Sequence, residues 1–166
     1  ATWEAREQWY EHLAYLIGRI RTSSERAYVF LHRCLYESSD VQLKSLAIQS
    51  LGWLYDRGSK RLFERIALGK FSTTTCFCHL RGNPSDFWFE TFVVTDLAAD
   101  LNIPKALSPI ERLGLQRRAL EALSYVGDSE TLERLAARPP DWDLELEQAF
   151  YWTTEEILAR LSEAYL

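Results

Sequence analysis

The residues with the most potential for chemistry form the run Cys76-x-Cys78-His79. Thiolates and imidazoles are the ligands that zinc prefers in proteins, and His32 or Cys34 could complete a tetrahedral site. The usual zinc signature has two well-spaced pairs, commonly Cys-x2-Cys, and this chain lacks it. Because free cysteine is readily buried as a small apolar residue, we favour packing over metal binding here. A small zinc-binding module is kept as an alternative function.

Other patterns typical of catalysis are absent from the sequence. Its seven glycines stand singly, so it holds neither a phosphate-binding loop nor a dinucleotide fingerprint. No G-x-S-x-G elbow occurs, and the three histidines are scattered. The neighbouring acids Glu155 and Glu156 are more typical of a solvated helix face than of an acid-base pair. We therefore expect a protein without enzymatic activity and without a cofactor.

Charge is distributed unevenly along the chain, although its net value is only −5. Residues 57–81 hold six basic side chains and one acid, whereas residues 82–166 hold 7 basic and 16 acidic side chains. Four basic residues are expected to share a helix face that contacts a partner: Arg57, Lys60, Arg61 and Arg65. Such a partner would be anionic, either an acidic protein segment or a nucleic-acid backbone. The acidic balance of the chain disfavours nucleic acid, so a nucleic-acid-binding module is an alternative function.

The chain holds six tryptophans, which is many for 166 residues. Tryptophan dominates the energetics of many protein interfaces, but it also fills gaps between helices. Trp142 and Trp152 flank the acidic start of the last predicted helix and are expected to contact a partner. The other four are expected to pack inside the protein.

Helical periodicity is the main structural signal in the sequence. The first helix is predicted over about 2–21, with one apolar face formed by Tyr10, Leu13, Leu16, Ile17 and Ile20. Further helices are predicted to start near residues 22, 39 and 59, and then over 109–126, 129–138 and 144–165. The fold class is therefore all-α.

Capping residues punctuate these helices. Thr22 with Glu25, and Ser39 with Gln42, have the spacing of a capping box. Ser59 is a candidate cap for the short helix that ends at Gly69. The clearest start is Ser108-Pro-Ile-Glu111, which combines an N-cap serine, proline at the first helical position and a glutamate three residues after the cap.

Residues 70–86 interrupt the helical pattern, because they are rich in threonine and aromatic residues and poor in helix formers. We expect an irregular insertion there. The segment 87–94 has the composition of a strand, yet the apolar residues of 87–101 recur every four positions. A helix is favoured for it, and a strand is the alternative.

Two segments of the chain resemble each other, 43–67 and 109–137. In their alignment Leu51 matches Leu123 and Trp53 matches Tyr125, an offset of 72 residues. The run from Gln116 to Asp128, with its basic-alanine start, leucine-rich helix and Gly-Asp turn, resembles the HEAT-like repeats of bacterial scaffold proteins. This resemblance implies antiparallel helical hairpins stacked as a short α-solenoid that presents a binding surface, without catalytic residues.

The chain is expected to form a single helical-repeat domain over 1–166, as a fragment of a larger multidomain protein. No signal peptide is expected, and no apolar stretch of the sequence is long enough to span a bilayer. Three cysteines are too few for a disulfide scaffold, which favours the reducing cytoplasm. The expected function is that of a protein-interaction scaffold or regulatory module whose partner is a protein or a neighbouring domain.

Overall fold

The computed structural model describes residues 3–22, 24–38, 40–70 and 107–163. In these ranges the chain forms seven α-helices, a short 3-10 helix and no strand, which confirms the all-α prediction. The elements are α1 (Trp3–Ile20), α2 (Glu25–Glu37), α3 (Val41–Trp53), η1 (Arg57–Ser59), α4 (Lys60–Ala67), α6 (Pro109–Val126), α7 (Ser129–Ala136) and α8 (Leu144–Glu163). The predicted insertion at 70–86 and the segment 87–101 lie outside the described residues, apart from Lys70.

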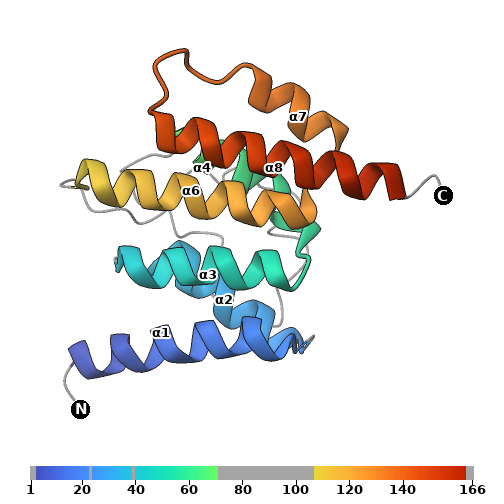
Figure 1. Cartoon of the computed structure of the whole chain (residues 1–166). Coiled ribbons are helices and arrows are strands. Elements are labelled where there is room, and N and C mark those ends of the chain that lie inside the picture. The colour runs from blue at the N-terminus through green and yellow to red at the C-terminus, as the bar shows by residue number, and fades with distance from the viewer. Residues whose placement is uncertain (1–2, 23, 39, 71–106, 164–166) are drawn as a thin grey trace.

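Four helices, α1, α3, α6 and α8, lie side by side in one layer (Figure 1). The other three helices form a second layer, in which α2 packs on α3 and α4 packs on α6, while α7 contacts α4 and α8. Both α3 and α6 therefore have helices on several sides. Their apolar residues spread around the helix instead of forming one narrow stripe.

One continuous core joins the two layers. Its fully buried members come mainly from α2, α3, α4 and α6, and include Leu31, Leu35, Ala47, Ile48, Leu51, Phe63, Ile66, Leu115, Leu120 and Leu123. The two segments that resemble each other in sequence, 43–67 and 109–137, supply most of these residues. Burying them is the main favourable contribution to folding, at about 25 cal/mol per Å² of apolar surface.

Small residues allow the helices of the first layer to approach closely. A Cβ atom added at Gly52 would lie 2.8 Å from the Cα of Ala122, and one added at Gly18 would lie 2.7 Å from the Cβ of Ser50. The Ser50 hydroxyl also donates a hydrogen bond of 2.6 Å to the Ala14 carbonyl, across the contact between α1 and α3. Larger residues at these crossings would force the helices apart.

The predicted caps of α2 and α3 are wrong by one or two residues. Helix α2 has Ser24 as its N-cap, and the Thr22 hydroxyl accepts from the Ser24 amide at 3.4 Å instead of capping the helix. Helix α3 is capped by Asp40, whose carboxylate accepts from the Gln42 amide at 3.0 Å. A carboxylate one position closer to the helix has displaced the predicted Ser39, which lies outside the described residues.

The caps of α6 and α7 both form complete boxes. Ser108 and Glu111 exchange the two predicted hydrogen bonds, at 3.1 and 3.2 Å. Asp128 and Thr131 do the same for α7, at 3.0 and 3.1 Å, and this second box was not predicted from the sequence. The turn between α6 and α7 is short because Gly127 ends one helix and its neighbour caps the next.

The apolar face predicted for the first helix is partly wrong. Ile17 is buried and Leu13 packs on the core, but Leu16 and Ile20 are exposed. Helix α1 lies at the edge of its layer and packs mainly on α3, so only one side of it is covered (Figure 1). Among the described helices, none has both the length and the apolar composition needed to cross a membrane.

Candidate functional site

The cysteines and histidine that suggested zinc, Cys76, Cys78 and His79, lie outside the described residues. The remaining cysteine, Cys34, is buried on α2, and burial raises the pKa of its thiol to about 12. A thiol with so high a pKa is protonated at neutral pH and is a poor metal ligand. In the described parts of the chain, no group of three or more metal-ligating side chains comes together.

A histidine, an aspartate and a serine do meet at the turn between α3 and α4. His32 Nε2 lies 2.9 Å from Asp56 Oδ2, and the Ser59 hydroxyl donates to the same oxygen at 2.7 Å. Burial alone would raise the pKa of Asp56, but the hydrogen bonds and the charge of His32 hold it below its usual value. In a catalytic triad the histidine stands between serine and acid, whereas here the acid stands between the other two. This cluster is therefore a buried clamp that ties the turn to α2.

The four predicted basic residues, Arg57, Lys60, Arg61 and Arg65, lie on η1 and α4. Lys60 Nζ donates to Asp128 Oδ2 at 2.5 Å, and this contact joins α4 to the start of α7. With Lys60 and the Thr131 amide as donors, the pKa of the Asp128 carboxyl falls to about 2 although partial burial opposes the shift. Arg61 Nε lies 3.8 Å from the buried Glu64. Part of the positive charge on α4 therefore faces acids of the same chain.

The two predicted tryptophans differ in their surroundings. Trp142 is half-buried and packs edge-to-face on Phe150, with ring centroids 6.3 Å apart. Trp152 is 46% exposed and lines a groove on the first helical layer. Of the tryptophans expected to be internal, Trp53 lines the same groove, and Trp9 is exposed on α1.

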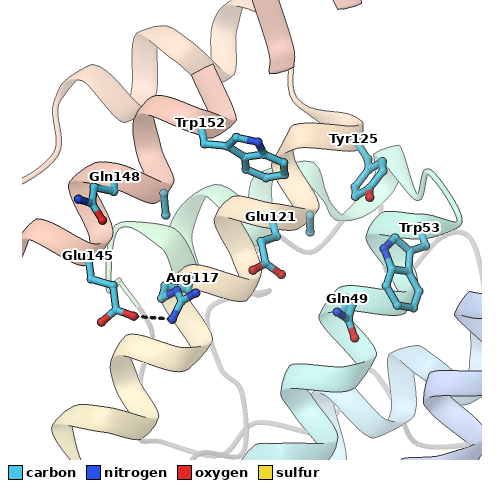
Figure 2. A pocket seen from close by; sticks show the side chains of 10 residues that line it. Gln49, Trp53, Arg117, Glu121, Tyr125, Glu145, Gln148 and Trp152 are labelled. Atoms are coloured by element: carbon cyan, nitrogen blue, oxygen red, sulfur yellow. Dashed lines mark hydrogen bonds and ion pairs between the residues drawn. The ribbon is translucent and has the colours of Figure 1, made fainter. Parts of the chain in front are cut away.

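This groove lies over α6, between α3 and α8, and encloses about 480 Å³ (Figure 2). Three helices each contribute one aromatic ring to it: Trp53 from α3, Tyr125 from α6 and Trp152 from α8. Two alanines, Ala122 and Ala149, also line the groove, and their small side chains leave space in it. Ala122 is also the residue that a Cβ added at Gly52 of α3 would meet, at 2.8 Å from its Cα. The small side chain of Ala122 thus allows both the close packing of α3 on α6 and the open groove.

Helix α8 is positioned over α6 by buried contacts. The Thr153 hydroxyl donates to the Leu120 carbonyl at 2.9 Å, and Phe150 and Ile157 are buried on the same side. Trp152 precedes Thr153 and points into the groove beside the exposed face of α6 (Figure 2). The core contacts of α8 therefore decide where the indole lies.

Charged and amide side chains complete the groove. Arg117 Nη1 and Glu145 Oε1 lie 2.5 Å apart and join α6 to α8 (Figure 2). Glu121 accepts from Arg118 at 3.1 Å and turns toward the groove, where Gln49 and Gln148 also lie. The lining offers rings, amides and charges, and no paired nucleophile and base. These side chains could contact a ligand or a segment of a partner.

A second hollow of about 270 Å³ continues from the groove toward the end of α8. Tyr125 and Trp152 line both hollows, so the two form one continuous surface. Beyond these rings the lining includes Glu156 and Glu163. Arg160 donates to the Ser124 carbonyl at 2.9 Å and forms part of the same wall.

Of the residues that line this groove, only Trp152 was predicted from the sequence to contact a partner, and the groove itself was not predicted. A usable signal was present, because Trp53 and Tyr125 occupy matching positions of the two similar segments. Residues at matching positions of adjacent parallel repeats face the same side.

Compared with protein-family models, with curated proteins and with solved structures, the chain matches none.

Proposed function

We propose that this chain is a non-catalytic protein-interaction module, a short HEAT-like stack of helical hairpins that binds a segment of a partner protein. The observation that carries this proposal is the groove in which Trp53, Tyr125 and Trp152 meet from three different helices. Rigid aromatic rings presented by packed helices lose little conformational entropy on binding, and they are the residues that dominate interface energies.

The helix arrangement supports the HEAT-like part of the proposal. Helices α3 and α4 are followed by α6 and α7, and the first helix of each pair packs on the other first helix. Contacts between α4 and α7 join the second helices in the same way. A stack of this kind presents a continuous surface that can follow an extended or helical segment of a partner.

The alternatives receive less support from the described residues. A nucleic-acid-binding module would need an unpaired basic face, whereas Lys60 contacts Asp128 and the groove itself contains several carboxylates. A partner in the same polypeptide or in a larger assembly would use the groove in the same manner as a separate protein. The module would then have a scaffolding or regulatory role.

A displayed library of random peptides, selected on the wild-type protein, tests this function. Peptides that are enriched should lose at least about tenfold in affinity toward Trp152→Ala, as expected for an interface hot spot. They should bind Trp9→Ala as well as the wild type, because Trp9 is an exposed tryptophan outside the groove. Fluorescence anisotropy of labelled peptides measures both affinities. The proposal fails if no peptide is enriched, or if enriched peptides bind the two variants equally.

A further inference from the structure

We propose that the segment held in the groove is basic, and that its arginine side chains pack on the exposed ring of Trp152 and face the carboxylates of α8. This inference rests on the proposed function and adds the chemistry of the partner. It is carried by the charges that line the two hollows and by the way this protein already pairs arginine with aromatic rings.

Acids outnumber bases along the continuous groove. Its lining contains four glutamates, Glu121, Glu145, Glu156 and Glu163, and two arginines, Arg117 and Arg160. Glu145 is neutralised by Arg117, and the Arg160 guanidinium is directed at the Ser124 carbonyl. Among the described residues, no cationic nitrogen lies within 4.0 Å of the Glu156 or Glu163 carboxylates, although the charge of Glu156 acts on Arg160 on the same helix. These two carboxylates provide negative potential beside the groove.

The two carboxylates share a helix face with the exposed tryptophan. Residues 152, 156 and 163 are separated by one turn and by two further turns of α8, which places them along one side of the helix. A segment lying along this side would meet the indole of Trp152 first and then Glu156 and Glu163. Helix α8 has 20 residues and is about 30 Å long, so an extended segment of roughly ten residues spans it.

The protein already packs arginine on rings beside this surface. The guanidinium of Arg19 lies 5.6 Å from the ring centroid of Trp53, and that of Arg21 lies 5.9 Å from the ring centroid of Tyr55. Although Tyr125 lines the same groove, the ring of Trp152 forms no stacked, edge-to-face or cation–π contact with the other described residues. It is therefore available to accept the same kind of contact from a partner.

Arginine fits this surface better than the other side chains that could occupy it. A planar guanidinium stacks on an indole and donates hydrogen bonds to a carboxylate in the same plane, whereas the lysine ammonium is a compact and strongly hydrated charge. An acidic segment would be repelled by Glu156 and Glu163. An apolar segment would cover these carboxylates without pairing them, which is unfavourable.

Synthetic peptides of about ten residues that differ only in one type of residue test the inference. The four peptides alternate glycine or serine with arginine, lysine, citrulline or glutamate. Citrulline has the shape of arginine without its charge. Anisotropy titrations should give the tightest binding for the arginine peptide, at least about tenfold weaker binding for citrulline and none for glutamate. Binding of the arginine peptide should weaken when the salt concentration is raised from 0.1 to 0.5 M, because the Debye length then falls to about half of its value of about 10 Å.

Matched variants locate the contact on the protein. Glu156→Gln/Glu163→Gln should weaken the arginine peptide at least about fivefold, and Trp152→Ala at least about tenfold. Glu25→Gln/Glu133→Gln removes the same charge from exposed sites on α2 and α7, and should have little effect. Thermal unfolding of each variant checks that its fold is retained.

The outcomes separate this inference from the function on which it rests. Equal affinity for the arginine and citrulline peptides, or equal effects of the two double variants, overturns the basic-segment inference. If library peptides that depend on Trp152 prove acidic or apolar, the inference also fails while the interaction module stands. If no peptide of any composition depends on Trp152, both fail together.

Discussion

The buried carboxylate of Glu64 links α4 to α7, and its removal should show how much this link stabilises the fold. Arg134 donates to both of its oxygens, from Nε and from Nη2, the latter at 2.8 Å. Thr131 Oγ1 adds a third hydrogen bond of 2.9 Å. The Glu64 side chain is 2% exposed and that of Arg134 is 28% exposed. We consider the substitution Glu64→Gln, which keeps the size of the side chain and removes its charge.

The expected loss follows from these contacts. A hydrogen bond to a charged group contributes about 1.5–3 kcal/mol, and two of them join Arg134 to the carboxylate. Glutamine keeps one acceptor, but it also places an amide donor against the guanidinium. Because Arg134 is partly exposed, it can turn toward water when its partner is lost, which reduces the penalty. We therefore expect the free energy of unfolding to fall by about 2–3 kcal/mol.

Urea and thermal unfolding monitored by circular dichroism measure this loss. For a domain of this size, 2–3 kcal/mol corresponds to a decrease in Tm of roughly 4–12 °C. Glu130→Gln is the matched control, because Glu130 contacts the same arginine at 3.4 Å but is 67% exposed. The control should lose less than about 0.5 kcal/mol. Equal losses for the two variants would refute the conclusion that burial makes the Glu64 contact strong.

Three further predictions concern packing and titration. Gly52→Ala should lower the free energy of unfolding in urea by about 1–3 kcal/mol, because its Cβ would collide with the backbone of α6. Gly114→Ala should raise it by about 0.5–1 kcal/mol, because nothing lies within 4 Å of the new Cβ. A loss of stability at both positions would contradict this reasoning. Asp128→Asn keeps a capping side chain but removes the charge that contacts Lys60. The folded pKa of Asp128 is about 2, which is below its unfolded value. The stabilising effect of the aspartate should therefore be complete above pH 4 and disappear as the pH falls toward 2. A difference in the free energy of unfolding between wild type and variant that does not change with pH would contradict this prediction. Burial lowers the pKa of Lys44 to about 7, so the unfolded chain binds more protons between pH 7 and 10, and the stability of the wild type should rise over this range relative to Lys44→Met. Urea unfolding of both proteins at pH 7 and pH 10 measures this rise. The same difference in stability between the two proteins at both pH values would show that the lysine is not buried in solution.

The helices of this protein could be predicted well from the sequence because their signals are local. The box formed by Ser108 and Glu111 and the stop at Gly127 involve residues within a few positions of one another, and both helices beside them begin or end near the predicted residues. The errors at the starts of α2 and α3 are also local. Several serine, threonine and aspartate residues compete there, and which of them caps depends on small differences in backbone direction.

The exposed apolar residues of α1 show where local signals fail. Periodicity indicates that Leu16 and Ile20 lie on an apolar face, but it does not indicate which part of that face a neighbouring helix covers. Helix α3 covers the side that bears Ala14 and Ile17, and their neighbours stay in solvent. The same reasoning explains the tryptophans. Whether Trp142 packs on Phe150 or faces a partner is decided by the path of the chain into α8.

The sequence by itself determined the fold class and the approximate helix ends, because hydrogen bonding within a helix and periodicity of 3.6 residues act over short distances along the chain. Only the tertiary structure decided how Lys60 meets Asp128, which lies 68 residues further along, and how Trp53, Tyr125 and Trp152 surround one groove. Those contacts depend on how closely whole helices approach. That approach is set by small residues such as Gly52 and Ala122, whose effect appears only when the helices are packed together.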